Sequence, residues 1–246
     1  MTRTREQATG LVDRLHAAGA SVAIVPLITT VPIADPDSIV RTAGEAQAGA
    51  SPRWVAFTSA TAVRLVLGAA GRGAISGLLV AAVGPATAAS LTAEGVDPEL
   101  VAGESDADGL ARSMLERGVS GGSVWLPVAE GARAGLAEAL RTGGAMVTVQ
   151  RVYRSVMPES APDRLRAAFA GGVDAITLTS GSTARHLVEA LGGEAPPPEA
   201  VIVCIGDHTA AAARTAGLAV RAVAGVATVE GLVRALIECL TPQPLR

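Results

Sequence analysis

Small hydroxyl side chains directly follow apolar, strand-like runs at two distant places in the chain. Thr58-Ser59-Ala60 comes after Trp54–Phe57, and Thr179-Ser180-Gly181-Ser182 comes after the run that ends at Leu178. Serine or threonine in such a turn caps a helix by accepting a bond from an orphan backbone N–H. The same turn leaves backbone donors and a partial positive charge at the carboxyl edge of a sheet, which suits an anion. One such turn taken alone is ordinarily a helix cap and nothing more.

Two further turns place a glycine at the same kind of junction. They are Val83-Gly84-Pro85, with Thr87 beyond it, and Ile205-Gly206-Asp207, with Thr209 beyond it. The glycine lets the backbone bend sharply or approach a ligand closely. Neither turn completes the glycine pattern of a dinucleotide-binding fold or of a phosphate-binding loop, so no nucleotide cofactor is predicted. Four turns of this kind favour a ligand with many negative charges.

The four turns form two pairs, because the chain repeats itself. The offset is nearly constant in three motifs, with 179 − 58 = 121 for the hydroxyl turns, 206 − 84 = 122 for the glycine turns, and 231 − 109 = 122 for a looser Gly-Leu motif that Ser105 precedes. A constant offset predicts two homologous domains, and paired domains usually face each other across a cleft. A weaker repeat relates Gly10-Leu11 to Gly135-Leu136, with 136 − 11 = 125.

Strand-like and helix-like patterns alternate along the chain, which predicts an α/β protein with doubly wound parallel sheets. The helix at Gly10-Leu11 precedes the hydroxyl turn of its copy. The helix at Gly135-Leu136 instead follows the separate motif at Gly109-Leu110. The domains are therefore predicted to be discontinuous, with residues 1–30 and 155–246 in one, residues 34–150 in the other, and two crossings at 26–33 and 151–157. The expected strands are Ser21–Ile28, Trp54–Phe57, Leu78–Val83, Val96–Val101, Val124–Leu126, Met146–Val152, Val173–Thr179, Val201–Ile205 and Leu218–Val223.

Two more residues are candidates for a site. Tyr153 is the only tyrosine and stands at the second predicted crossing, where it either packs at an interface or presents its phenol as a proton donor. Arg133 is expected to open a helix, where a cation is locally unfavourable, so it is either an anion contact or simply a solvated arginine. The three histidines are scattered without ligand spacing, so no metal site is predicted. No motif for a covalent nucleophile is present.

Composition narrows the class of protein further. The chain has 246 residues, 49% of them hydrophobic but only 2% aromatic, and a net charge of −3. Neither the charge nor any basic run supports a nucleic-acid partner. No stretch reaches the roughly 18 apolar residues of a membrane span, and the first residues lack an apolar signal core. Cys204 and Cys239 are expected to be buried free thiols, which favours a cytoplasmic location.

With these motifs in this order, the chain resembles the uroporphyrinogen-III synthase family over nearly its whole length. The elements that carry the resemblance are Thr2-Arg3, Gln7-Ala8, Pro26-Leu27-Ile28, Phe57-Thr58-Ser59-Ala60, Val83-Gly84-Pro85 with Thr87-Ala88, Val152-Tyr153, Leu178-Thr179-Ser180, and Cys204-Ile205-Gly206 with Thr209-Ala210. Each motif is modest, and the ordered set is more specific than its members.

The resemblance implies two flavodoxin-like three-layer domains with parallel sheets, joined by a two-stranded linker. It implies a cofactor-free, metal-free lyase that closes linear hydroxymethylbilane, which carries eight carboxylates, into uroporphyrinogen III with inversion of ring D. The protein would be a monomer that receives its substrate from hydroxymethylbilane synthase. Tyr153 would assist departure of the hydroxyl. The residues expected to bind substrate are Arg3, Thr58, Ser59, Ala60, Gly84, Thr87, Ser105, Arg133, Thr179, Ser180, Gly181, Ser182, Gly206 and Thr209.

Two other functions fit parts of the sequence. One is a non-catalytic, tetrapyrrole-sensing regulatory domain that keeps the binding residues without turnover. The other is a two-domain receptor of the periplasmic binding type, which the absence of a recognisable signal segment disfavours.

Overall fold

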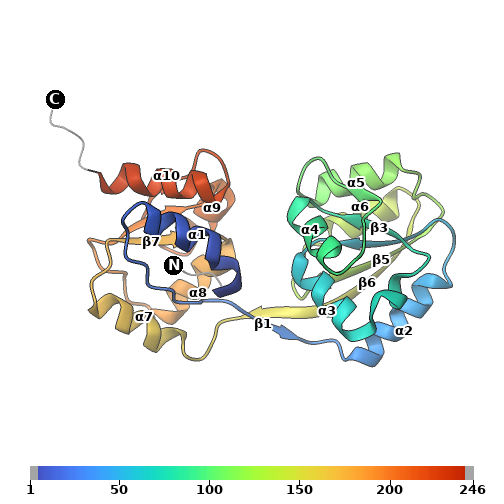
Figure 1. Ribbon diagram of the computed structural model, residues 1–246, viewed down its shortest axis with the longest axis horizontal. Helices are drawn as coiled ribbons and strands as arrows, with labels where there is room; N and C mark the ends of the chain where they lie inside the picture. Colours follow the sequence, from blue (N-terminus) through green and yellow to red (C-terminus); the bar gives the residue numbers. More distant parts are fainter. Residues whose placement is uncertain (1–4, 242–246) are drawn as a thin grey trace. The chain divides into compact units, whose positions relative to one another are not determined.

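The computed structural model describes residues 5–241, with side chains described from residue 10 onward. The chain divides into two compact units (Figure 1). Unit 1 comprises Met1–Thr29 and Val156–Arg246, and unit 2 comprises Thr30–Ser155. The chain therefore passes from one unit to the other twice.

Unit 2 contains a six-stranded sheet with the strand order β1-β6-β5-β2-β3-β4. The pairings β2–β3, β2–β5, β3–β4 and β5–β6 are all parallel. The strands are β1 (Thr29–Pro32), β2 (Arg53–Phe57), β3 (Leu79–Ala82), β4 (Leu100–Val101), β5 (Ser123–Ala129) and β6 (Met146–Val156). The helices are α2 (Pro36–Gln47), α3 (Ala60–Ala70), the 3-10 turn η1 (Arg72–Ile75), α4 (Pro85–Ala93), α5 (Ala107–Glu116) and α6 (Gly135–Thr142).

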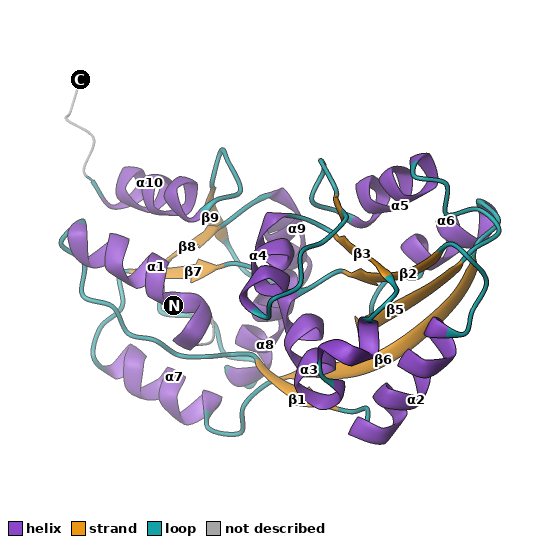
Figure 2. Cartoon of the chain, turned by 45° about the vertical axis from the view of Figure 1, so that its right-hand side comes forward, coloured by secondary structure: helices purple, strands orange, loops and turns teal. Residues whose placement is uncertain are grey.

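The two faces of this sheet carry separate cores, because successive strand residues point to opposite sides. Val55 and Phe57 of β2 pack with the helices α2, α3 and α4 on one face. Trp54 and Ala56 of the same strand pack with α5 and α6 on the other (Figure 2). Both faces of β2 are thus covered, which explains why its sequence is a continuous apolar run rather than an alternating one.

Unit 1 contains a three-stranded parallel sheet with the order β7-β8-β9. One face packs against α7, α8 and α9, and the other against α1 and α10. The strands are β7 (Ala175–Leu178), β8 (Val201–Cys204) and β9 (Val220–Val223), and the helices are α1 (Arg5–Ala17), α7 (Ala161–Ala170), α8 (Gly181–Ala190), α9 (Asp207–Thr215) and α10 (Val229–Leu240).

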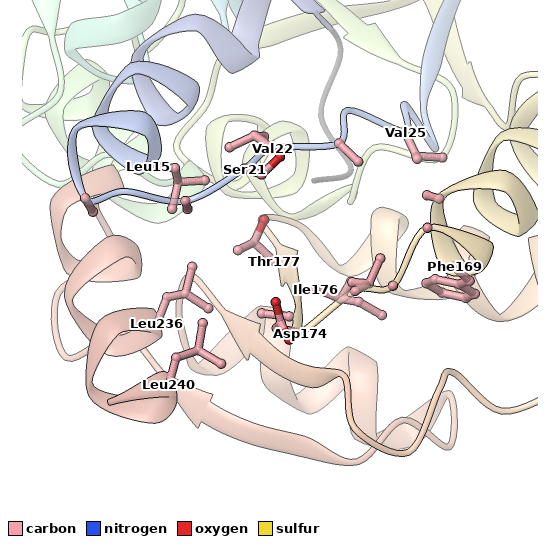
Figure 3. Close-up of a pocket in the computed structure, with 18 of the residues that line it drawn as sticks. Leu15, Ser21, Val22, Val25, Phe169, Asp174, Ile176, Thr177, Leu236 and Leu240 are labelled. Atoms are coloured by element: carbon pink, nitrogen blue, oxygen red, sulfur yellow. The ribbon is translucent and has the colours of Figure 1, made fainter. Parts of the chain in front are cut away.

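The sequence-based strand assignments need three corrections, the first being that β1 (Thr29–Pro32) was not among them. Ser21–Ile28 was expected to be a strand, but the chain takes no regular structure between α1 and β1 at Thr29. Ser21, Val22, Ala23 and Val25 line a cavity there (Figure 3). The run Val96–Val101 shortens to Leu100–Val101, which pairs with the last two residues of β3. None of the helices described between Arg5 and Thr241 is long and apolar enough to cross a membrane.

Candidate functional site

The turn between β2 and α3 carries the first hydroxyl pair. Ser59 is extended, with φ −158° and ψ 146°, and its Oγ accepts a hydrogen bond from the backbone N–H of Ala62 at 3.1 Å. Ser59 is thus the N-cap of α3, as the sequence predicts. Thr58 and Ala60 on either side of it are half-buried. The turn leaves the hydroxyls at the carboxyl end of a central strand of the unit 2 sheet.

Tyr153 reaches this turn from β6. Its phenol oxygen lies 3.0 Å from the Oγ of Ser59, and the residue is only 9% exposed. Its backbone is held as well, because the Tyr153 carbonyl accepts a bond from the N–H of Glu130 at 2.6 Å. A register shift in the β5–β6 ladder places Tyr153 opposite Ala129. The sequence identifies both residues but not their contact, since this register shift has no signature in the composition.

The turn between β3 and α4 brings a glycine against a serine. Gly84 is the N-cap of α4, and no side chain caps this helix. A Cβ atom at Gly84 would lie 2.5 Å from the Oγ of Ser105, so only glycine fits beside that serine. Ser105 itself is exposed, whereas Thr87 in the first turn of α4 is only 4% exposed. Thr87 is thus almost fully buried at the start of α4.

The sequence predicts two arginines, Arg133 and Arg3, as anion contacts. Arg133 is exposed and lies two residues before α6, so it does not open that helix as expected, and α6 begins at Gly135. It follows β5, whose carboxyl end shares a sheet edge with those of β2 and β3. Arg3 lies outside the described residues.

Unit 1 repeats the hydroxyl turn with a fuller cap. The Oγ of Ser180 accepts a bond from Thr183 N at 3.2 Å, and the Oγ1 of Thr183 accepts one from Ser180 N at 3.2 Å. This reciprocal pair is a capping box. Thr179, Gly181 and Ser182 in the same turn are half-buried.

One cation in unit 1 is missing from the sequence-based set. The Nη2 atom of Arg185 donates a hydrogen bond to the Oγ of Ser182 at 3.2 Å, which brings an exposed guanidinium to the start of α8. The signal was the spacing of three residues on one helix face, which places these side chains together once the helix start is known.

The second glycine turn of unit 1 also lacks a side-chain cap. Gly206 is the N-cap of α9, and Asp207, which could have capped this helix, makes no capping bond and is exposed. Thr209 is 5% exposed. A Cβ atom at Gly206 would lie 3.4 Å from the Cβ of Ala227, an ordinary packing distance, so this turn is less crowded than its counterpart at Gly84.

Each unit thus places two helix starts at the carboxyl edge of its own sheet, one capped by serine and one beginning at an uncapped glycine. The N-cap residues of α4 and α9 are glycines and make no side-chain capping bond, and a helix start attracts negative charge. Among the described side chains, no group of three or more histidine, cysteine, aspartate or glutamate residues could hold a metal ion. The side chains at these edges include hydroxyls, one phenol and arginines, which suit hydrogen bonding and proton donation, together with the exposed carboxylate of Asp207 at the start of α9.

Comparison with known proteins points to the same family that the sequence motifs resemble. A family model described as uroporphyrinogen-III synthase HemD matches residues 10–234. A curated relative from Methanothermobacter thermautotrophicus, whose name contains the same enzyme designation, is 34% identical over 117 residues, which are 46% of this chain and 46% of the relative. The match therefore spans less than half the length of that relative.

Two solved structures share the fold. Uroporphyrinogen-III synthetase from Helicobacter pylori has a TM-score of 0.66 at 15% identity, covering 90% of this chain and 96% of that one. A mutant uroporphyrinogen III synthase from Thermus thermophilus has a TM-score of 0.59 at 19% identity, covering 96% of both chains. At these identities the likeness establishes an α/β fold. Because the family model covers most of the sequence, this chain belongs to the uroporphyrinogen-III synthase HemD family.

Proposed function

We propose that this protein closes hydroxymethylbilane into uroporphyrinogen III with inversion of ring D. The observation that carries the proposal, beyond family membership, is the contact between Tyr153 and Ser59. It places an acidic O–H group at the sheet edge where the uncapped helix of unit 2 also begins. The reaction needs a proton for a departing hydroxyl and fixed donors for many carboxylates, and these residues offer both.

Tyr153 is the proposed proton donor. The Oγ of Ser59 accepts from Ala62 N–H, so its own hydrogen is available to the phenol oxygen of Tyr153. The phenol hydrogen is then left to point at the substrate. Hydrogen bonds in such a chain polarise one another, and the start of α3 favours negative charge on the oxygen atoms at its end. Negative charge that develops on the phenol oxygen during proton donation is stabilised in this way.

The reaction balances with no further reagent. The bond between the hydroxymethyl carbon and its oxygen breaks as a pyrrole nitrogen lends its electron pair, and the oxygen leaves as water with the donated proton. The resulting azafulvene cation is attacked by ring D at its substituted carbon to give a spiro intermediate. The bond that joined ring D to the neighbouring ring of the chain then breaks. That ring re-attaches at the other α-carbon of ring D, which inverts ring D. Loss of a proton from carbon restores the aromatic pyrrole and can reprotonate Tyr153.

Carboxylate binding is proposed for the helix starts of each unit. The uncapped starts of α4 and α9 supply backbone donors, while Ser105 lies against Gly84 and Arg185 brings a cation to Ser182. A hydrogen bond with an ionised partner contributes about 1.5–3 kcal/mol. This mode of binding relies on backbone amides and hydroxyls, so the net charge of −3 is compatible with an anionic substrate. The proposed substrate-binding set also keeps the other residues that the sequence predicts, which are Thr58, Ala60, Thr87, Thr179, Ser180, Gly181, Thr209, Arg3 and Arg133.

The proposed domain arrangement, oligomeric state and location are those that the family resemblance implies. The two units would be flavodoxin-like domains formed by residues 1–30 with 155–246 and by residues 34–150, joined by a two-stranded linker at 26–33 and 151–157. We expect a cytoplasmic monomer that takes its substrate from hydroxymethylbilane synthase. The division of the chain near Thr29 and Val156 supports this arrangement.

The test is the isomer of the product. Hydroxymethylbilane is generated in the assay, the purified chain is added, and uroporphyrinogens I and III are separated. The expected result is isomer III in molar excess over the added enzyme, which requires repeated turnover. Isomer I alone, which forms spontaneously, would reject catalysis. Tight binding of the bilane without isomer III would instead favour the tetrapyrrole-sensing alternative.

A further inference from the structure

Two successive residues of β6, Val152 and Tyr153, are buried on the same face of the unit 2 sheet. Both belong to the core that α2, α3 and α4 cover, and they are 1% and 9% exposed. Successive strand residues normally point to opposite faces. A regular strand that buries Val152 here would therefore turn Tyr153 to the other face, toward the core of α5 and α6 and away from Ser59.

The register shift in the β5–β6 ladder removes this conflict. The ladder pairs Ala129 with Tyr153 and adds Val152 to β6 as an extra residue. One extra residue is a β-bulge, and a shift by one residue moves the following side chains to the other face. Tyr153 thereby shares a face with Ala129, which packs against the same core. The bulge thus aims the phenol at the Oγ of Ser59, 3.0 Å away.

The backbone of the bulge is held from two sides. The carbonyl of Val152 accepts a hydrogen bond from the N–H of Ile33 at 3.1 Å, just after β1. The carbonyl of Tyr153 accepts one from the N–H of Glu130 at 2.6 Å. Glu130 is the first residue after β5, so the second bond ties Tyr153 to the turn that follows that strand.

This turn spans residues 129–132 and is a type II β-turn. The N–H of Ala132 donates to the carbonyl of Ala129 at 3.1 Å and closes it. Gly131 has φ +77°, and among the described residues only glycines have a positive φ, so Glu130 has a negative one. This combination defines type II and favours glycine or asparagine at the second central position. A Cβ atom at Gly131 would meet nothing within 4 Å, so glycine serves here through its backbone alone.

We propose that the turn of residues 129–132 is a positioning element for Tyr153. The N–H of Glu130 fixes the bulge in β6 and so holds the phenol against Ser59. The inference rests on the proposed function, in which the phenol donates a proton to the departing hydroxyl. Such a donor has to be held in place, since a displacement of about 1 Å can lower a rate about a hundredfold.

Proline and alanine at position 130 separate the N–H of Glu130 from its exposed carboxylate. Glu130→Pro removes the N–H and keeps the turn, because proline is favoured at the first central position of a type II turn. Its ring also occupies the place of the hydrogen that bonds to Tyr153. Glu130→Ala is the matched control, since it removes the same carboxylate and keeps the N–H.

The first readout needs no substrate. Tyr153 is the only tyrosine, so tyrosine labelled with carbon-13 at Cζ gives a single NMR resonance that reports on this phenol. In Glu130→Pro we expect the resonance to move toward its position in Ser59→Ala, where the phenol has lost its partner. In Glu130→Ala we expect the wild-type position. A wild-type position in Glu130→Pro, or an equal shift in Glu130→Ala, would overturn the proposal.

The second readout is the rate of isomer III formation. We expect kcat to be about tenfold lower in Glu130→Pro than in Glu130→Ala, with KM within about twofold, because the turn acts on the proton donor and not on carboxylate binding. A shifted resonance with equal kcat in the two variants would uphold the aiming of the phenol and contradict the proposed role of Tyr153. The NMR comparison decides the positioning even if the wild-type chain forms no isomer III.

A second pair of variants tests the turn without proline. Gly131 and Gly118 both have φ +77° and open space around a Cβ atom, and they lie at opposite ends of β5. Alanine at either position is strained to a similar extent. Gly131→Ala should shift the tyrosine resonance, Gly131→Asn should restore it because asparagine tolerates a positive φ, and Gly118→Ala should leave it unchanged. An equal shift in both alanine variants would overturn the proposal.

Discussion

The phenol oxygen of Tyr153 and the Oγ of Ser59 lie 3.0 Å apart although 94 residues separate them in the chain. The parallel ladder from β6 through β5 to β2 brings the two side chains to one edge of the sheet. Ser59 has two tasks in this arrangement, since it caps α3 and also touches the phenol. The pair can therefore be separated by mutation into a stability effect and a rate effect.

Replacing Tyr153 with phenylalanine keeps the ring and removes only the hydroxyl. We expect Tyr153→Phe to lower the rate of isomer III formation more than tenfold, because the departing hydroxyl loses its proton donor. The free energy of unfolding should change by about 1 kcal/mol or less, the usual net contribution of one hydrogen bond. Rates from the isomer assay and urea unfolding curves measure the two effects. An unchanged rate would remove Tyr153 from the mechanism.

The serine caps offer a matched comparison of stability. Ser59→Ala and Ser180→Ala each remove an N-cap, at a cost of about 0.5–2 kcal/mol. We expect the larger loss at Ser59, because Ser59→Ala also removes the contact with the Tyr153 phenol, whereas in Ser180→Ala the Oγ1 of Thr183 keeps its bonds to the backbone N–H and C=O of residue 180. Urea denaturation of both variants gives the ranking. Ser59→Ala should in addition lower the rate, whereas a normal rate in this variant would show that the phenol works without the serine.

The two glycine turns predict a difference in tolerance. Gly84→Ala places a methyl group 2.5 Å from the Oγ of Ser105, whereas Gly206→Ala places one 3.4 Å from Ala227. Gly84→Ala should therefore displace the turn and lower activity clearly, and Gly206→Ala should be close to neutral for stability. The double variant Gly84→Ala with Ser105→Gly removes the clash and should recover most of the loss. Equal damage from both single variants would contradict the packing argument.

The cysteines predict a stability change at high pH. Burial raises the pKa of the Cys204 thiol from 9.0 to about 11, against a smaller opposing effect of the positive charge of Arg214. The folded protein then holds this proton more tightly than the unfolded chain does. Stability is full below pH 9 and falls as the pH rises from 9 toward 11, because only the unfolded state releases the proton there.

Urea unfolding at pH 8, 9.5 and 10.5 measures this fall, and Cys204→Ala should lack the part of it that comes from the thiol. At pH 8 a thiol reagent should modify the half-buried Cys239 before it modifies Cys204, which is fully buried. Rapid modification of Cys204 in the folded protein would contradict the burial that raises its pKa.

Local chemistry made much of this fold predictable. Ser59 and Ser180 cap helices because a short hydroxyl after a strand has few other uses, and their turns lie where the repeat places them. Residues whose structure depends on distant partners could not be found in this way. Residues 21–28 have strand composition, yet they take no regular structure. The contact of Tyr153 depends on a register shift at Ala129, and that of Arg185 on the exact start of α8.

Because the chain passes from one unit to the other twice, the two units are completed at different times during synthesis. All residues of unit 2 leave the ribosome in one uninterrupted stretch, so its sheet can form while translation continues. Helix α1 belongs with α10, as their shared core with Leu11 and Leu232 shows, yet nearly the whole sequence lies between them. Unit 1, whose first helix is translated before any part of unit 2, is therefore completed last, because Leu11 and Leu15 of α1 are buried only when α10 has been made.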